Sequence, residues 1–321
     1  MSFTRRDFLI GAAAGAATMT AFDSFEPAGA AAPAMQLIDT HQHLWDTKSL
    51  DVPWLKDKEA AKIATPHTMA DYLREAKGLG IIKTIYMEID AAESAQAKEA
   101  DFVIATCKSG KTPMKKGVIS GRPATAGFAD FARKYKDVAY IQGFRQILHP
   151  SNRPKGLCLQ PQFVKNIQLL GELGKSYDLC IRPGELLDGD KLVAQCPKTR
   201  FVVDHCGNGE ANWGGKGADF ELWKKGIVAL AKRPNTIIKL SGVIKTTSEK
   251  GNKVEELKPL TSHVIQTFGP SRVIWASDWP VCEFKASLKE WVETAHALTS
   301  SLSSADQKKI FHDNAAKFYG V

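Results

Sequence analysis

The alternation of short β-branched segments with amphipathic stretches limits most strongly how this chain can fold. Eight strand-like segments follow one another, at 35–40, 81–89, 116–120, 139–146, 178–182, 200–205, 236–242 and 272–278. Apolar residues at three-to-four spacing predict helices between and after them, at 68–79, 93–109, 125–135, 160–176, 185–195, 219–232, 256–268, 285–299 and 304–318. Strands that alternate with helices form parallel β–α–β units.

Eight such units within residues 35–321 predict a single-domain α/β chain folded as a (β/α)8 TIM barrel, a fold of about 250 residues. A doubly wound open sheet is the alternative. That fold carries a glycine-rich phosphate turn after its first strand. This chain has Ile-Asp-Thr-His-Gln-His at 38–43 instead, which favours the barrel.

Residues 1–34 have the pattern of a twin-arginine signal peptide. Arg5 and Arg6 precede an apolar run at 9–22, and small residues at 28–32 offer a cleavage site. We expect the twin-arginine export machinery to carry the folded chain to the periplasm and the signal to be removed. No stable membrane association would then remain. An uncleaved membrane anchor is the alternative.

Charge and cysteine spacing narrow the classes of partner. The net charge of +8 becomes +9 without residues 1–34, which hold two arginines against three acidic residues. The lysines are scattered, so we expect a small-molecule partner and no nucleic acid. The six cysteines show no CxxC spacing, which argues against a zinc knuckle or a redox pair.

Titratable residues stand where predicted strands end, which is where barrels of this kind place their chemistry. His41 and His43 end the first strand, and alternate side chains of a strand share a face. Both imidazoles would therefore point into the barrel mouth, as two metal ligands or as two donors to one substrate oxygen. Packing histidines are the alternative.

Asp278 and His205 are the predicted catalytic residues. Asp278 ends the last strand and is placed to take a proton from water, or alternatively to cap the following helix. His205 can bind a carbonyl oxygen or relay a proton, unless it is a core histidine. Its neighbour Asp204 should face the other side of the strand. Four tryptophans near the mouth suit a substrate site, with Trp279 as the chosen contact: Trp45, Trp54, Trp213 and Trp279.

Arg145 and Arg182 end the fourth and fifth predicted strands. A buried guanidinium needs an anionic partner, and a substrate carboxylate could supply it through a bidentate contact. Both arginines are therefore predicted to bind an anionic or polyhydroxylated substrate. The alternative is an internal salt bridge, for instance to Asp278 or Glu88. The other histidines are expected in loops or outer helices and receive no role: His67, His149, His263, His296 and His312.

Several motifs together give the chain a family resemblance. They are Ile-Asp-Thr-His-Gln-His-Leu-Trp-Asp at 38–46, Val-Asp-His-Cys-Gly at 203–207, Lys-Leu-Ser-Gly at 239–242, Ala-Ser-Asp-Trp-Pro at 276–280 and Asn-Ala-Ala-Lys-Phe-Tyr-Gly at 314–320. With these motifs the chain resembles the amidohydrolase superfamily, in particular the amidohydrolase-related group that includes sugar-lactone and pyrone-dicarboxylate lactonases.

The resemblance implies a metal site in the members that use metal. His41, His43 and Asp278 would be ligands of one zinc ion, together with a histidine on the fifth strand. Here Arg182 stands in that place, and Arg145 stands where a carboxylated lysine would be sought. Some lactonases of the group resemble this arrangement and work without metal. We therefore expect either no cofactor or one weakly held divalent metal.

These observations predict a hydrolase that opens a lactone, with Asp278 as general base and histidines around the developing oxyanion. Two alternatives remain. One is a metal-dependent amidohydrolase or decarboxylase that uses His41, His43 and Asp278. The other is a catalytically inactive barrel that only binds its ligand.

Overall fold

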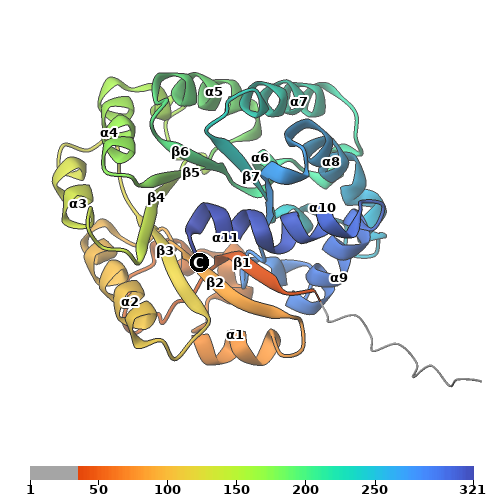
Figure 1. The fold of residues 1–321 in the computed structure, drawn as a ribbon, viewed down its shortest axis with the longest axis horizontal. Helices are drawn as coiled ribbons and strands as arrows, with labels where there is room; N and C mark the ends of the chain where they lie inside the picture. Colours follow the sequence, from red (N-terminus) through yellow and green to blue (C-terminus); the bar gives the residue numbers. More distant parts are fainter. Residues whose placement is uncertain (1–34) are drawn as a thin grey trace, which may run out of the picture. The chain divides into compact units, whose positions relative to one another are not determined.

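Eight parallel strands form one sheet in the order of the chain, as the alternation predicts (Figure 1). The computed structural model describes residues 35–321, so the predicted signal peptide lies outside the described residues. The strands are β1 Leu37–Gln42, β2 Ile81–Met87, β3 Met114–Ser120, β4 Ile141–Ile147, β5 Ser176–Cys180, β6 Arg200–Val203, β7 Thr236–Leu240 and β8 Val273–Trp275.

Helices follow the strands, and the longer ones pack outside the sheet (Figure 1). They are α1 Met69–Glu75, α2 Gln96–Ser109, α3 Phe128–Lys134, α4 Pro161–Glu172, α5 Leu186–Gln195, α6 His205–Asn208, α7 Ala218–Ala231, α8 Lys253–Phe268, α9 Leu288–Thr299, α10 Ser304–Lys308 and α11 Asn314–Tyr319. Five strands end two or three residues earlier than predicted: β2, β5, β6, β7 and β8. β5 ends two residues before Arg182, and β8 ends three residues before Asp278.

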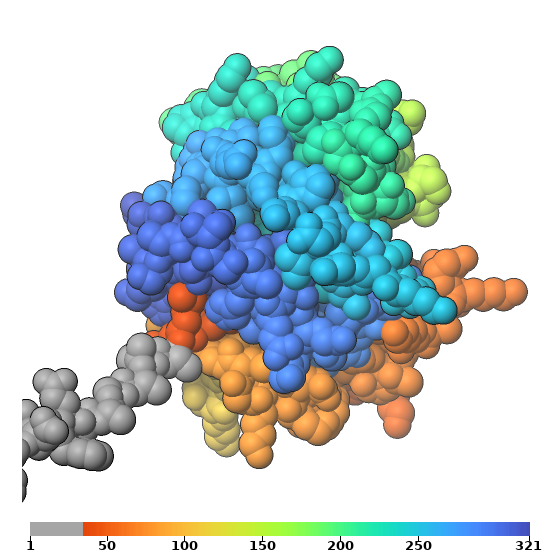
Figure 2. Space-filling model, turned by 90° about the vertical axis from the view of Figure 1, so that its right-hand side faces the viewer, coloured from red at the N-terminus to blue at the C-terminus, as the bar shows by residue number. Residues whose placement is uncertain are grey.

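The barrel is nearly closed by contacts between the segments that follow β1 and β8. His43 N donates to Trp279 O at 2.9 Å, and Asp278 N donates to His41 O at 2.9 Å. Figure 2 shows a face of the molecule on which segments from the end of the chain lie against the start of the barrel. These hydrogen bonds place His41 and His43 beside Asp278, although more than 230 residues separate the two histidines from the aspartate along the chain.

Apolar side chains fill the inside of the barrel below the polar strand ends. They come from five strands and from α11, which lies across the centre of the ring of strands (Figure 1): Ile38, Ile85, Met87, Val118, Val202, Ile274, Ala315 and Tyr319. The interior is therefore a packed core and not a pore. The polar groups of the site lie toward the carboxyl ends of the strands.

Two further features concern export and redox chemistry. Within residues 35–321, no helix has both the length and the apolar character needed to cross a membrane. All six cysteines are buried and free. Cys180, the middle residue of the predicted strand 178–182, is the last residue of β5.

Candidate active site

Asp278 is the centre of the site. It is 1% exposed and has a left-handed backbone conformation (φ 57°), which a non-glycine residue rarely adopts outside functional sites. Its Oδ1 atom lies 3.5 Å from His41 Nε2, 3.3 Å from His43 Nε2 and 3.8 Å from His205 Nε2. Its Oδ2 atom is buried and has no hydrogen-bond partner within residues 35–321. One carboxylate oxygen is therefore open to a ligand or to water.

Neighbouring imidazoles keep this carboxyl ionised. Burial by itself raises the pKa of Asp278, but His205, His43 and His41 together hold that pKa well below its usual range. The helix-cap alternative does not apply, because the side chain of Asp278 caps no helix and only its backbone carbonyl accepts a hydrogen bond, from Cys282 N at 2.9 Å.

In His43 and in His205, the hydrogen-bond partner of Nδ1 determines whether Nε2, the nitrogen nearer Asp278, donates or accepts. His43 Nδ1 lies 3.0 Å from the carbonyl oxygen of Met87. Because a carbonyl only accepts, Nδ1 carries the proton, and Nε2 of a neutral His43 presents a lone pair toward Asp278. Two acceptors thus face each other at 3.3 Å. A water molecule, a proton or a cation is needed between them.

His205 has a different partner. Its Nδ1 lies 2.9 Å from Ser241 Oγ, a hydroxyl that can donate to it. With that donation, Nε2 carries the proton and His205 is a donor toward the cavity. Burial lowers the pKa of His205 to about 4, so the ring is neutral near pH 7. Its backbone is also left-handed (φ 53°).

Gly242 allows this arrangement of His205. Its φ of +67° is unfavourable for L side chains, and a Cβ there would lie 2.4 Å from His205 Nδ1. The glycine in the Lys-Leu-Ser-Gly motif thus makes room for the imidazole that Ser241 orients.

Arg145 is held by protein groups, which is the internal-salt-bridge alternative that the sequence left open. Its Nε donates to Glu88 Oε1 at 2.7 Å, and its Nη1 lies 3.1 Å from both Asp204 Oδ2 and His41 Nε2. The side chain is 2% exposed. Its Nη2 donates to Glu88 O at 2.8 Å, and Arg145 lines the inner cavity, so the predicted contact with a substrate anion stays a prediction.

Arg182 is also engaged within the protein. Since β5 ends at Cys180, Arg182 lies beyond the strand, where its guanidinium donates to Glu185 and to the carbonyl oxygens of Pro150 and Arg153 at 2.5–2.6 Å. It still lines a cavity next to the site. The substrate-binding role of Arg182 stays a prediction.

Trp279 lies apart from the cavity that Asp278 lines. Its indole packs against His67 and Tyr72, with ring centroids 5.3 Å away in each case, and donates to Glu283 Oε1 at 2.7 Å. Trp279 is 1% exposed. Of the tryptophans named from the sequence, Trp54 is the one that lines this cavity.

Asp204 corrects an expectation. It was predicted to face away from the site, but it is fully buried inside the barrel with Arg145 and with Lys239, whose Nζ lies 3.0 Å from Asp204 Oδ1. Lys239 also donates to Asp178 Oδ2 at 2.6 Å and lies 3.2 Å from His41 Nδ1. The Lys-Leu-Ser-Gly motif was the only sequence signal that could have pointed to Lys239.

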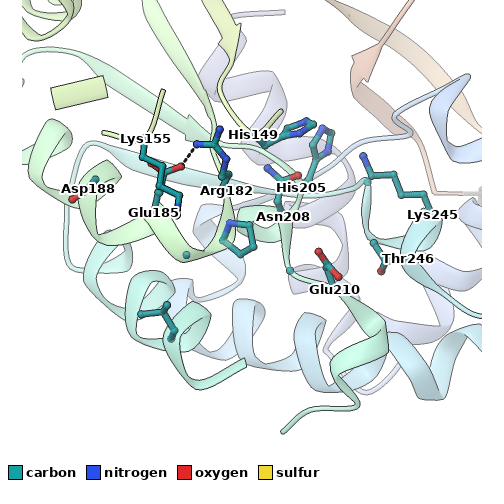
Figure 3. A pocket seen from close by; sticks show the side chains of 15 residues that line it. His149, Lys155, Arg182, Glu185, Asp188, His205, Asn208, Glu210, Lys245 and Thr246 are labelled. Carbon is teal, nitrogen blue, oxygen red and sulfur yellow. Dashed lines mark hydrogen bonds and ion pairs between the residues drawn. The ribbon is translucent and has the colours of Figure 1, made fainter. Parts of the chain in front are cut away.

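Two cavities meet at the site. The inner one, of about 240 Å³, is lined by His43, His205 and Asp278 with apolar walls that include Trp54 and Phe284. The outer one, of about 850 Å³, opens over the ends of β5 to β7 (Figure 3). Three residues line both cavities: His149, His205 and Lys245. His149 and Lys245 were not singled out from the sequence.

The fold and the site together define a barrel enzyme with histidines and an aspartate at its carboxyl end. A model of the amidohydrolase family matches residues 38–321, and the chain belongs to this family. The predicted resemblance is thus confirmed.

Relatives of the chain include proteins named as lactonases, which are hydrolases. L-fucono-1,5-lactonase of Burkholderia multivorans is 23% identical over 292 residues, covering 88% of this chain and 96% of that protein. L-rhamnono-gamma-lactonase of Scheffersomyces stipitis is 24% identical over 222 residues, covering 61% and 66%. These relatives support the prediction of a hydrolase.

Solved structures share the fold. An amidohydrolase from Burkholderia multivorans with bound zinc has a TM-score of 0.76 at 21% identity, covering 89% of this chain and 99% of that one. A probable 2-pyrone-4,6-dicarboxylic acid hydrolase from Acinetobacter baumannii has a TM-score of 0.71 at 16% identity, covering 89% and 100%. A 2,6-dihydroxybenzoate decarboxylase from Rhizobium has a TM-score of 0.60 at 12% identity, covering 89% and 99%.

The residues fit a metal ion only in part. His41, His43 and Asp278 offer ligand atoms within 4.8 Å of one another, and the facing acceptors of His43 and Asp278 would suit a cation. However, Arg145 Nη1 lies 3.1 Å from His41 Nε2, the nitrogen that would face a metal ion at Asp278. A complete ligand set would require Arg145 to move away.

Proposed function

We propose that this enzyme hydrolyses a lactone, with Asp278 as the general base. The observation that carries the proposal is the orphaned Oδ2 of an ionised, buried carboxylate beside three imidazoles. The lactonase names of the relatives support the reaction class. The inner cavity of about 240 Å³ is below the roughly 300 Å³ at which pockets begin to hold drug-sized ligands, so one small ring suits it.

In the first step, a water molecule bound to Oδ2 of Asp278, next to His43, attacks the carbonyl carbon of the lactone. Asp278 takes one proton of the water, and His43 Nε2 accepts a hydrogen bond from the other, which aims the oxygen. The C–O bond forms while the carbonyl electrons move to its oxygen. His205 Nε2–H, oriented by Ser241, donates to this oxyanion.

In the second step, the tetrahedral intermediate collapses and the bond from carbon to the ring oxygen breaks. The leaving alkoxide takes the proton from Asp278, which yields the hydroxy acid and restores the carboxylate. Because neighbouring imidazoles hold the pKa of Asp278 low, its protonated form readily gives that proton up.

Replacing Asp278 with asparagine tests the base directly. Asp278→Asn keeps the size of the side chain but cannot take a proton, so we expect kcat to fall by at least about 10²–10⁴-fold. Binding of the hydroxy-acid product, measured by calorimetry, should persist. Asp51→Asn, which removes a carboxylate from an exposed pair with Lys56, is the matched control and should leave kcat unchanged. Near-normal turnover by Asp278→Asn would show that another group is the base.

A metal-dependent hydrolase or decarboxylase is the second candidate, favoured by the facing acceptors of His43 and Asp278. A bound divalent ion would polarise a substrate oxygen or activate a water molecule. Elemental analysis of natively purified protein, followed by a chelator test on lactone hydrolysis, distinguishes the two candidates. About one zinc per chain, with activity lost to the chelator, would favour the metal. Retained activity without metal would favour Asp278 acting alone.

We propose that the enzyme works in the periplasm after twin-arginine export. The support is the sequence of residues 1–34, with Arg5 and Arg6 before an apolar run. Replacing both arginines with lysine should leave the protein in the cytoplasm at the length of the full chain. Fractionation and mass measurement of the N-terminus check this, and periplasmic delivery of the double variant would contradict it.

A further inference from the structure

The outer cavity is the largest feature next to the site that the proposed reaction does not use. Its volume of about 850 Å³ is more than three times that of the inner cavity, of about 240 Å³. Since pockets of roughly 300–1,000 Å³ bury drug-sized ligands, the outer cavity alone can hold a group larger than the lactone ring. The two cavities join at His149, His205 and Lys245, so one ligand can extend through both.

The lining of the outer cavity contains many polar side chains and is balanced in charge. Ten of its fifteen lining residues carry polar or charged side chains, with three cationic and three anionic residues among them. The charged residues are Lys155, Arg182 and Lys245 against Glu185, Asp188 and Glu210. A balance of signs disfavours a ligand group of high net charge. It suits a neutral group rich in hydroxyls, which can both donate and accept hydrogen bonds.

Three of these charged groups are available to a ligand. Lys155, Lys245 and Glu210 have no ion pair or side-chain hydrogen bond within the described part of the chain, whereas Arg182 is paired with Glu185 and Asp188 with Lys191. In Figure 3 the ammonium group of Lys245 is turned toward His205, and Glu210 lies lower on the same side of the cavity. A ligand that extends from the inner cavity into the outer one would pass Lys245, which lines both.

The loops that carry Lys245 and Glu210 are joined by hydrogen bonds. Thr246, next to Lys245, accepts a hydrogen bond at its Oγ1 from Ala211 N at 2.9 Å and donates to Val243 O at 2.7 Å. Ala211 follows Glu210 directly. The positions of Lys245 and Glu210 are therefore fixed relative to each other, as a binding subsite requires.

We infer that the outer cavity is a second substrate subsite, which binds a neutral, hydroxylated substituent about the size of a further sugar on the lactone that the inner cavity holds. The inference rests on the proposed function for the identity of the ring. It makes the preferred substrate an extended lactone, such as that of a disaccharide acid. Lys245 and Glu210 would donate to and accept from the hydroxyls of the substituent.

The test fills the outer cavity without altering the inner one. Gly184 lines the outer cavity, and a Cβ there would meet only Leu222, at 3.9 Å. Gly184→Trp therefore places an indole in the subsite, and Gly184→Ala is the matched control. Leu222→Trp approaches from α7, where Leu222 is 39% exposed, and provides a second variant if the first folds poorly.

Binding of two hydrolysis products is measured by calorimetry: gluconate, which has one sugar unit, and cellobionate, which has two. We expect the unmodified enzyme to bind cellobionate at least tenfold more tightly. Gly184→Trp and Leu222→Trp should remove that preference and leave gluconate binding within about twofold, since the inner cavity is untouched. Gly184→Ala should keep the preference.

Equal affinities for the two products, no binding of either, or a preference that survives both tryptophan variants would overturn the inference. Hydrolysis of glucono-1,5-lactone and cellobiono-1,5-lactone is measured in parallel. A binding preference without hydrolysis of either lactone would refute the proposed reaction and leave the subsite standing. Equal hydrolysis of both lactones with equal product binding would refute the subsite alone.

Discussion

Replacing Arg145 with methionine should destabilise the barrel strongly. Methionine keeps an unbranched apolar stem but removes the guanidinium that holds Glu88 and Asp204, which are both fully buried. Removing one partner of a buried ion pair costs about 3–5 kcal/mol, because an uncompensated charge remains. Glu88 keeps hydrogen bonds from Ser120 Oγ at 2.7 Å and Asp90 N at 2.6 Å, and Asp204 keeps Lys239. We therefore expect a loss near the lower end, about 3 kcal/mol.

This loss can be measured by urea unfolding and by thermal melting. At about 2–4 °C per kcal/mol for domains of 150–250 residues, 3 kcal/mol corresponds to a Tm lower by roughly 6–12 °C. Glu88→Gln in the same background should recover part of the loss, because it removes one of the stranded charges. Arg133→Met, at an exposed pair with Asp130, is the control and should change stability by less than about 0.5 kcal/mol.

Two results would refute this reasoning. If Arg145→Met unfolds like the unmodified enzyme and mainly raises KM for anionic lactones, Arg145 is a substrate ligand and not a structural cation. If the effects of Arg145→Met and Glu88→Gln simply add, the two residues are not coupled as their 2.7 Å contact implies.

Two further predictions concern His205 and the residue that makes room for it. Burial lowers the pKa of His205 to about 4, against about 6.5 in the unfolded chain, so the unfolded chain takes up the proton first as the pH falls. The stabilisation by neutral His205 is therefore complete above pH 6.5 and is lost toward pH 4, by about 1.4 kcal/mol per pH unit. His205→Asn should flatten that slope when urea unfolding is measured at a series of pH values. An unchanged slope would mean that His205 does not titrate in this way. Gly242→Ala should lower both kcat and the free energy of unfolding, since the new Cβ would meet His205. Gly78→Ala is the control: Gly78 has a similar φ of +79° with open space around it, so this variant should cost only about 1 kcal/mol and no activity. Equal effects of the two alanine variants would contradict the role of Gly242.

The fold followed from the sequence because strand and helix periodicities alternate without interruption. Eight parallel strands need only that pattern, and the long sequence separation between β1 and β8 is bridged by the closure of the barrel itself. Strand ends were less predictable. Arg182 was placed at the end of the fifth strand, but β5 ends at Cys180, so Arg182 leaves the barrel and pairs with Glu185. Propensity does not fix where a strand gives way to a loop.

The same limit explains the error at Asp204. Alternation would send Asp204 and His205 to opposite faces, but β6 ends at Val203, and His205 takes a left-handed conformation. Asp204 continues the alternation of β6, in which Val202 points into the barrel, whereas His205 departs from it, so both side chains enter the barrel. The buried network of Asp204 with Arg145 and Lys239 was hidden for the same reason. The network depends on which residues of different strands lie at the same height along the barrel axis, and local sequence does not encode that height.

That network also explains why the three histidines of the site should not be interchangeable. His41 lies between Arg145, 3.1 Å from Nε2, and Lys239, 3.2 Å from Nδ1, so burial and the charge of Lys239 hold the pKa of His41 well below 6.5. A ring fixed as neutral between two cations can neither relay a proton nor donate freely to an oxyanion. His43, tied to a carbonyl, is left as an acceptor, and His205, tied to Ser241, is left as a donor. In His43 and His205, the hydrogen-bond partner of Nδ1 thus determines whether the ring accepts or donates at the site.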